Sequence, residues 1–161
     1  MNDIPARIAT AQWMLERQLG WIAGAEIKVG LVITLDIAML GGIAATFSAS
    51  PTKTAWAYLM VIVACSLALI GLACAAYAVN PRLDGPTRSL LYFGRIAETT
   101  EPDYVQAFNR TTDEQILEDW LVQVHRNAEI ATVKHRWVKR AIYSSFLSTP
   151  PWVIAIALLS H

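Results

Sequence analysis

The chain has 161 residues, of which 55% are hydrophobic and only 16% are charged, and its mean hydropathy is +0.38. A soluble domain usually carries about 25% charged residues, so the composition excludes an ordinary soluble domain. Thirteen basic side chains balance thirteen acidic ones, and a net charge of zero provides no global attraction to nucleic acid. The composition therefore predicts an integral membrane protein that does not bind nucleic acid.

Residues 1–28 predict an N-terminal amphipathic helix. The apolar residues that share one side of it are Ile8, Ala11, Leu15, Leu19 and Ile22. Charged side chains are scattered through the first 20 positions, which is not the pattern of a cleavable signal peptide. The helix either lies on the membrane, packs on a long polar helix later in the chain, or simply runs into the first span.

Three runs that are poor in charge predict transmembrane helices at residues 29–49, 55–79 and 141–160. The second run has 25 uncharged residues, enough for about 37 Å of helix across a hydrocarbon core of about 30 Å. The alternative interpretation is that these runs are buried core helices, but apolar runs in such helices rarely exceed about 14 residues. The turn at residues 50–53 folds the first two spans into a hairpin, residues 29–79. Small residues on the second span, expected to form a helix–helix or subunit contact, are Ala64, Ala68, Gly71 and Ala75.

Glu26, Lys28 and Asp36 are candidates for gating or for lining a pore. Glu26 and Lys28 are two residues apart and do not share a helix face, so one of them must face another element. Asp36 lies about 12 Å deeper along the helix than Lys28, where a carboxylate is costly unless it faces a bundle interior, a cavity or a partner. Asp36 is therefore either a pore or gate residue, or a structural carboxylic acid, protonated and bonded to a neighbouring Ser or Thr.

Residues 80–140 are the only long polar stretch and predict a small helical cytosolic module between spans two and three. Within it, residues 111–140 predict one helix of about 45 Å, because two threonines precede Glu114 and Gln115 by three residues, a doubled capping-box signal. Apolar residues at helical spacing along it are Leu117, Trp120, Leu121, Val124, Ala128, Ala131 and Val138. Ahead of it, residues 101–108 predict a short helix.

Basic residues are unevenly distributed along the chain. Residues 80–140 carry nine Lys and Arg, whereas the loop between the first two spans carries one. The positive-inside rule therefore predicts a cytoplasmic N-terminus and module, and an outside C-terminus. The third transmembrane helix, residues 141–161, contains two adjacent prolines that are expected to kink it. The residues expected to hold its entrance at the membrane interface are Lys134, Arg136, Trp137, Lys139 and Arg140.

No catalytic or metal-binding constellation is evident in the sequence. There is no Gly-rich phosphate loop, no metal-spaced Cys cluster, and no Ser beside a plausible His base. His125 and Glu129 could share a metal ion, but a second His is lacking, and a solvated His125 is the favoured interpretation. We therefore expect no enzymatic activity, no metal ion and no cofactor.

The polar module does hold side chains that suit an anionic small ligand. Arginines offer forked donors for a phosphate, aromatic rings can stack on a base or fill a core, and Asn127 could read a base edge. The candidate ligand-binding residues are Arg88, Tyr92, Phe93, Arg95, Arg126 and Asn127. Among them, Arg95 and Arg126 are expected to be essential for a nucleotide response. From the residues alone, the set indicates an anion or nucleotide sensor.

Three sequence blocks resemble one known family. They are WIAGAEIKVG at residues 21–30, LYFGRIA at 91–97 and HRNAEIATVKHRWVKRA at 125–141. In this order they are similar to the transmembrane effectors of Pycsar bacterial anti-phage systems, with Glu26 where an Asp is common in the family. The resemblance implies an effector of the bacterial inner membrane that is gated by cUMP or cCMP from a cognate cyclase and then damages the membrane. It implies no particular ligand-binding residue.

The favoured hypothesis is therefore a membrane effector whose cytosolic module binds a cyclic pyrimidine mononucleotide. Because three spans from one chain make a poor pore, this hypothesis implies a symmetric homo-oligomer in the lipid bilayer. The alternative is a non-enzymatic membrane scaffold or partner-anchoring protein whose module binds another protein. A sensor is stabilised by one nucleotide, whereas a scaffold responds to none.

Overall fold

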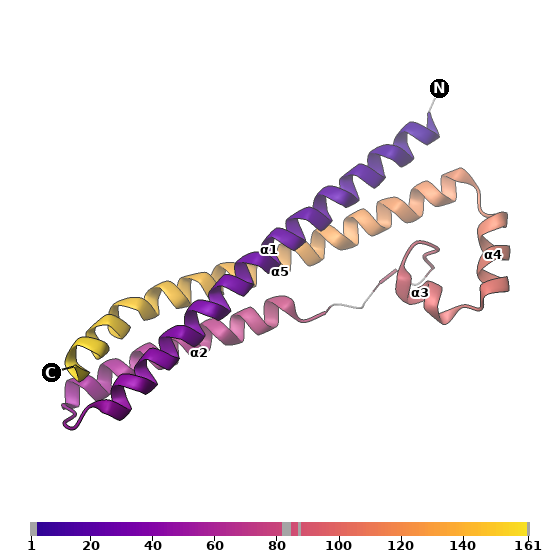
Figure 1. Ribbon diagram of the computed structural model, residues 1–161. Coiled ribbons are helices and arrows are strands. Elements are labelled where there is room, and N and C mark those ends of the chain that lie inside the picture. The colour runs from indigo at the N-terminus through magenta and orange to yellow at the C-terminus, as the bar shows by residue number, and fades with distance from the viewer. Residues whose placement is uncertain (1–2, 82–84, 87, 161) are drawn as a thin grey trace. The chain divides into compact units, whose positions relative to one another are not determined.

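The computed structural model describes residues 3–81, 85–86 and 88–160, and these residues form five helices and no strand (Figure 1). In chain order the helices are α1 (Ile4–Ala49), α2 (Ala55–Val79), α3 (Phe93–Glu98), α4 (Glu101–Arg110) and α5 (Asp113–Leu159). Three of them, α1, α2 and α5, are long and apolar enough to cross a membrane. The protein is therefore an all-α membrane protein, as the sequence predicts.

The chain divides into two compact units. The polar unit comprises Met1–Ala23 and Pro81–Val133, and the span unit comprises Gly24–Asn80 and Lys134–His161. α1 and α5 contribute to both units, whereas α2 belongs to the span unit and α3 and α4 belong to the polar unit.

α1 joins the predicted N-terminal helix to the first span without a break. The N-terminal helix therefore runs into the first span, and its residues 1–23 also form one compact unit with residues 81–133, which include the polar part of α5. A change of polarity along a helix leaves its backbone hydrogen bonds intact, and Pro5 lies in the first turn, where proline is tolerated. The buried side differs from the prediction by one residue, since Gln18 is 8% exposed whereas Leu19 is 49% exposed.

In the span unit, α1 and α5 bury stripes of residues at alternating steps of three and four, the spacing of helices that pack along one another. The buried positions of α1 are Ala25, Val29, Val32, Asp36, Met39 and Ile43, and those of α5 include Lys134, Val138, Ala141, Ser145 and Ser148. Ser145 contacts Asp36 and Ser148 contacts Met39, and each pair is separated by 109 residues. This equal separation means that the two helices run parallel and keep one register in the span unit.

α2 covers the residues predicted for the second span. Thr54 caps its N-terminus, because its hydroxyl oxygen accepts the Ala57 N–H at 3.2 Å. The predicted small-residue face is confirmed as buried at Ala64, Ala68, Gly71 and Ala75. Small side chains let a neighbouring helix approach closely, and Ser144 on α5 donates a hydrogen bond to the Leu67 carbonyl at 2.7 Å. This face is therefore a helix–helix contact within the chain.

α5 combines the predicted long polar helix and the third span into one element. Pro150 and Pro151 lie inside it, and the helix continues beyond them. From the predicted apolar stripe, the fully buried members are Leu117, Val124, Ala131 and Val138. Leu121 is instead 45% exposed.

The start of α5 is a reciprocal capping box, which the sequence predicts in doubled form. The Thr112 N–H donates to Gln115 Oε1 at 3.0 Å, and the Gln115 N–H donates to the Thr112 hydroxyl oxygen at 3.4 Å. Thr111 serves a different helix, since it ends α4 and its hydroxyl donates to the Ala107 carbonyl. α4 itself is the short helix predicted at residues 101–108.

Candidate functional site

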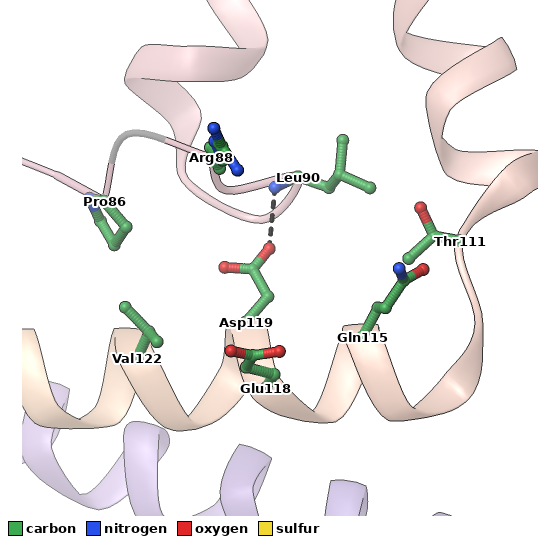
Figure 2. A pocket seen from close by; sticks show the side chains of 8 residues that line it. All are labelled: Pro86, Arg88, Leu90, Thr111, Gln115, Glu118, Asp119 and Val122. Carbon is green, nitrogen blue, oxygen red and sulfur yellow. Dashed lines mark hydrogen bonds between the residues drawn. The ribbon is translucent and has the colours of Figure 1, made fainter.

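A cavity of about 520 Å³ lies in the polar unit (Figure 2). Its wall is formed by the segment before α3, the α4–α5 connection and the first turns of α5. The residues that line it are Pro86, Arg88, Leu90, Thr111, Gln115, Glu118, Asp119 and Val122. Its volume falls within the ~300–1,000 Å³ that is typical of small-molecule sites.

Asp119 on α5 fixes one wall of this cavity. Its Oδ2 accepts the backbone N–H of Leu90 at 2.8 Å and that of Leu91 at 3.2 Å, and the first of these bonds is visible in Figure 2. The Tyr104 hydroxyl on α4 donates to the Leu90 carbonyl at 3.0 Å. A segment without regular structure is therefore attached through its backbone to two helices.

Ser89 provides a second attachment of the same segment. Its buried hydroxyl oxygen accepts the N–H of Leu91 at 3.0 Å and that of Tyr92 at 2.9 Å. Gln123 on α5 donates its side-chain amide to the same oxygen at 2.9 Å. Because these polar groups satisfy one another, the cavity wall is preformed before any ligand binds.

The charges around the cavity are unequal. Arg88 is the only cation among the residues that line it, and it has no hydrogen-bond or ion-pair partner in the described part of the chain. Glu118 and Asp119 contribute two carboxylates, and Asp119 is occupied by the two backbone N–H groups. The cavity can therefore offer the Arg88 guanidinium to an acidic group and the Glu118 carboxylate, which has no partner among the described residues, to a hydrogen-bond donor.

Of the six predicted ligand-binding residues, Arg88 lines this cavity and the others do not. The rings of Tyr92 and Phe93 lie 4.9 Å apart, and Phe93 is 65% exposed. The Tyr92 ring also lies against Gly94, where a Cβ would come within 2.7 Å of it. Arg95 forms an ion pair with Glu98 one turn later on α3, at 2.5 Å.

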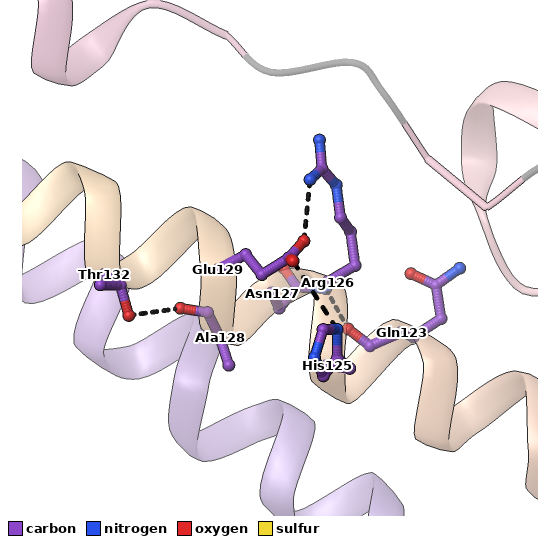
Figure 3. A network of polar contacts seen from close by, with 7 residues as sticks. All are labelled: Gln123, His125, Arg126, Asn127, Ala128, Glu129 and Thr132. Carbon is purple, nitrogen blue, oxygen red and sulfur yellow. Dashed lines mark hydrogen bonds and ion pairs between the residues drawn. The ribbon is translucent and has the colours of Figure 1, made fainter.

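Arg126 and Asn127 lie on α5, outside the cavity, in a network that Figure 3 shows. Arg126 forms an ion pair with Glu129 at 2.9 Å, and His125 Nδ1 lies 3.9 Å from the other oxygen of the same carboxylate. The Asn127 amide donates to the Gln123 carbonyl at 2.9 Å. These contacts join neighbouring turns of one helix.

In residues 3–81, 85–86 and 88–160 no group of three or more His, Cys, Asp or Glu could hold a metal ion.

In the span unit, Asp36 is fully buried where the three membrane helices meet. Its Oδ2 accepts the Ser145 hydroxyl of α5 at 2.9 Å. A Cβ at Gly71 of α2 would lie 2.5 Å from the same oxygen and 2.9 Å from the Ser145 hydroxyl oxygen. Asp36 Oδ1 has no hydrogen-bond partner among the described residues. The carboxyl group thus faces the interior of the bundle and is hydrogen-bonded to a serine. This is the geometry expected if Asp36 is a structural carboxylic acid rather than a pore or gate residue.

Glu26 is the member of the Glu26–Lys28 pair that faces another element. Its Oε1 lies 2.5 Å from the Lys134 ammonium of α5. The Lys134 side chain is only 9% exposed, so this basic residue lies in the helix packing of the span unit. Lys28 is exposed and has no ion-pair or hydrogen-bond partner in the part of the chain that the structure describes.

The other predicted interface residues surround two aromatic side chains of α5. The Arg140 guanidinium lies 4.5 Å from the Trp137 ring centroid, and the Lys139 ammonium lies 5.6 Å from that of Tyr143. Arg136, Lys139 and Arg140 are exposed. Cations stacked on aromatic rings at the end of an apolar segment are typical of a membrane–water interface.

Four functional candidates were not expected from the sequence: Glu118, Asp119, Gly71 and Ser145. Their positions depend on contacts with distant parts of the chain, so spacing alone gives no signal for them. Gly71 is a partial exception, because it belongs to the small-residue face of the second span.

No curated protein and no solved structure shows significant similarity to the chain. The family model described as PycTM, the Pycsar effector protein domain, matches residues 10–161. The match covers α2, α5 and all of α1 except its first turns. It also covers every described residue of the polar unit beyond residue 80. The chain therefore belongs to the Pycsar transmembrane effector family, a family of anti-phage membrane effectors.

Proposed function

We propose that this protein is a non-enzymatic effector that binds a cyclic pyrimidine mononucleotide, cUMP or cCMP, and then disrupts the bacterial inner membrane as a homo-oligomer. Family membership supports a cyclic-nucleotide signal from a cyclase and an association with the membrane. The observation that carries the ligand assignment is the preformed cavity in which Arg88 is the only cation among the described lining residues.

The charges of the cavity suit a ligand with a single negative charge. A cyclic mononucleotide is a phosphodiester with one charge, which the Arg88 guanidinium can bind through two parallel hydrogen bonds. A nucleoside triphosphate carries several charges and would meet the carboxylates of Glu118 and Asp119, with one arginine among the described lining residues to offset them. The cavity is thereby expected to reject the abundant nucleotides of the cytoplasm.

The pyrimidine base has donors that match the remaining carboxylate. Uracil has an N3–H group and cytosine has an amino group, and either can donate to Glu118. Pro86, Leu90 and Val122 supply the apolar wall of the cavity. We therefore place the phosphate at Arg88, the base edge at Glu118 and the sugar against the apolar wall.

Binding can affect the membrane because the ligand contacts and the third span belong to one helix. Glu118 and Asp119 are on α5, and the same helix carries Lys134 and Ser145, which contact α1 in the span unit. A ligand shifts this equilibrium only if its affinity differs between the resting and the disrupting state. In our proposal the Glu26–Lys134 and Asp36–Ser145 contacts define the resting state, and the liganded state weakens them.

A thermal-shift and calorimetric titration of the purified full-length protein tests the ligand assignment. We expect cUMP or cCMP to raise the melting temperature, whereas cAMP and UTP leave it unchanged. The active nucleotide should then release dye from liposomes that contain the protein. A protein that responds to no nucleotide but retains a soluble partner would instead be a membrane scaffold.

A further inference from the structure

A groove of about 240 Å³ runs between α1 and α5 in the span unit. Its walls include Leu31, Leu35 and Phe146, and Lys28 lies at its N-terminal end on α1. Leu31 and Phe146 are each 69% exposed. In a bilayer, such side chains face lipid, so the groove is open to the acyl-chain region along its length.

The end of the groove is cationic, and no described residue neutralises its charge. Lys28 has no partner among the described residues, whereas the nearby Glu26 is bound to Lys134. Lys139 lies three residues before Ile142 and seven before Phe146, so by helical spacing it is on the same side of α5 as these two groove residues. Basic side chains therefore lie beside one end of an apolar groove. This arrangement matches an anionic phospholipid, which has a charged headgroup and apolar acyl chains.

We propose that this groove binds one acyl chain of an anionic phospholipid of the inner leaflet, whose phosphate contacts Lys28. The volume is below the ~300–1,000 Å³ of sites for whole drug-sized ligands, so it suits part of a chain while the headgroup remains at the interface. Lys28 can extend its ammonium toward that headgroup while its methylene groups cover the apolar wall.

A second copy of the chain is a poorer occupant of the groove. The sequence ranges 24–80 and 134–161 contain two carboxylates, Glu26 and Asp36. Glu26 is bound to Lys134, and Asp36 is fully buried. A second span unit would therefore cover Lys28 without supplying a free anion, and an unpaired charge is costly at membrane depth. An anionic lipid supplies the missing charge, and this inference does not depend on nucleotide binding.

Native mass spectrometry of the detergent-purified full-length protein tests the proposal. The probes are phosphatidylglycerol and phosphatidylcholine with identical acyl chains, added to delipidated protein. We expect phosphatidylglycerol to be retained preferentially, and we expect Lys28→Gln to lower its retention about fivefold, the effect of one lysine near an anionic surface. Leu35→Trp, which fills the groove and leaves the charge intact, should lower retention of both lipids.

Two control variants separate a site from general attraction. Arg136→Gln removes the same charge from another exposed position of the interface, and Leu69→Trp adds the same ring to an exposed face of α2, outside the groove. Both controls should retain phosphatidylglycerol as the wild type does. If Arg136→Gln lowers retention as much as Lys28→Gln, the attraction is diffuse and the proposal is overturned.

Two further results would also overturn it. The first is equal retention of the two lipids by the wild-type protein. The second comes from Leu31→Cys in a chain without Cys65 and Cys74. If this variant forms a disulfide between protomers while it retains no lipid, a second copy of the chain fills the groove. Lys28→Arg keeps the charge and should retain phosphatidylglycerol, and its melting temperature and that of Lys28→Gln establish that both variants are folded.

Discussion

Ser145 donates a hydrogen bond of 2.9 Å to the carboxylate of Asp36, although 109 residues separate the two. Both residues are buried, and Gly71 of a third helix lies so close that a Cβ there would be 2.5 Å from the same carboxylate oxygen. One acidic side chain is therefore a point at which all three membrane helices of the span unit contact one another. Two properties of this point can be tested independently: how tightly it is packed, and whether its hydrogen bond is needed.

Gly71→Ala tests the packing. The added methyl group would overlap Asp36 Oδ2 and approach the Ser145 hydroxyl, and overpacking of this kind costs about 1–3 kcal/mol. We expect a lower melting temperature by circular dichroism in detergent. The matched control is Gly41→Ala, because a Cβ at Gly41 meets no atom within 4 Å, and Ala in a helix is favoured over Gly by about 0.5–1 kcal/mol. Equal melting temperatures for the two variants would contradict the tight contact.

Ser145→Ala tests the hydrogen bond. It leaves Asp36 buried without the hydrogen bond from the Ser145 hydroxyl, and an unsatisfied buried polar group costs about 1–3 kcal/mol. We expect destabilisation, whereas the control Ser66→Ala, at an exposed position of α2, should have a small effect. If Asp36 acts as a pore residue instead, Ser145→Ala leaves the melting temperature unchanged, and Asp36→Asn alters ion flux without altering stability.

Arg88→Ala tests the proposed nucleotide site. Loss of a charge-assisted contact to the phosphate costs about 1.5–3 kcal/mol, more than a tenfold loss of affinity. Arg95→Ala and Arg126→Ala remove the same charge at positions that pair with Glu98 and Glu129 outside the cavity. Calorimetric titration with cUMP and cCMP should show weak binding for Arg88→Ala and near wild-type binding for the other two.

The opposite result would support the set of residues predicted from the sequence. If Arg95→Ala and Arg126→Ala abolish binding and Arg88→Ala does not, the ligand contacts the α3 and mid-α5 surfaces, and the cavity is not its site. If all three variants bind as the wild type does, neither assignment holds.

The sequence predicts the membrane helices well because their signal is local. The second span was expected at residues 55–79, and α2 has these bounds, since a long uncharged run leaves few alternatives. The small-residue face of α2 could be predicted for the same reason, because close helix packing requires small side chains at a fixed spacing. Near residue 140 the absence of a helix breaker predicts that the polar helix continues into the third span, and α5 is continuous there. Near residue 28 a continuous helix is one of the alternatives left open by the sequence, and α1 has no break at that point.

The candidate site was harder to predict, because its residues act through the tertiary structure. A carboxylate on an amphipathic helix, such as Asp119, usually faces solvent, and its sequence context does not show that it binds the backbone of Leu90 and Leu91. In the sequence, Arg95 and Arg126 flank the aromatic residues and Asn127, and this placement favours them as ligand contacts. In the fold, Arg95 and Arg126 have acidic partners on their own helices, and Arg88 has none among the described residues.

The predicted topology can be tested with reporter fusions. The positive-inside rule gives a cytoplasmic N-terminus and polar unit, so fusions at Lys53 and after the C-terminal residue should both report a periplasmic location. A fusion at Asn109, in α4, should report the cytoplasm. A cytoplasmic signal from the C-terminal fusion would contradict the orientation of the third span.

The last prediction concerns how binding in the polar unit reaches the membrane. α5 extends from Asp113 to Leu159 without interruption, so the cavity residue Asp119 and the membrane contact Ser145 are parts of the same helix. Inserting Gly-Gly after Arg140 places two residues of poor helix propensity between them, and each destabilises the helix by about 1 kcal/mol relative to Ala. It also changes the rotation of the following helix. We expect the variant to bind nucleotide with wild-type affinity and to lose membrane depolarisation in cells and dye release from liposomes.

The control for this insertion is Gly-Gly after Pro51, in the turn between α1 and α2, which lengthens the chain without entering α5. It should bind and depolarise as the wild type does, and circular dichroism should show both variants to be helical and inserted. The basic residues beside the insertion also set topology, so a reporter fusion must confirm that the C-terminus of the Arg140 variant is still periplasmic. If that variant depolarises membranes fully at saturating nucleotide, α5 is a passive connector. The signal then reaches the spans through α1, where Glu26 forms an ion pair with Lys134.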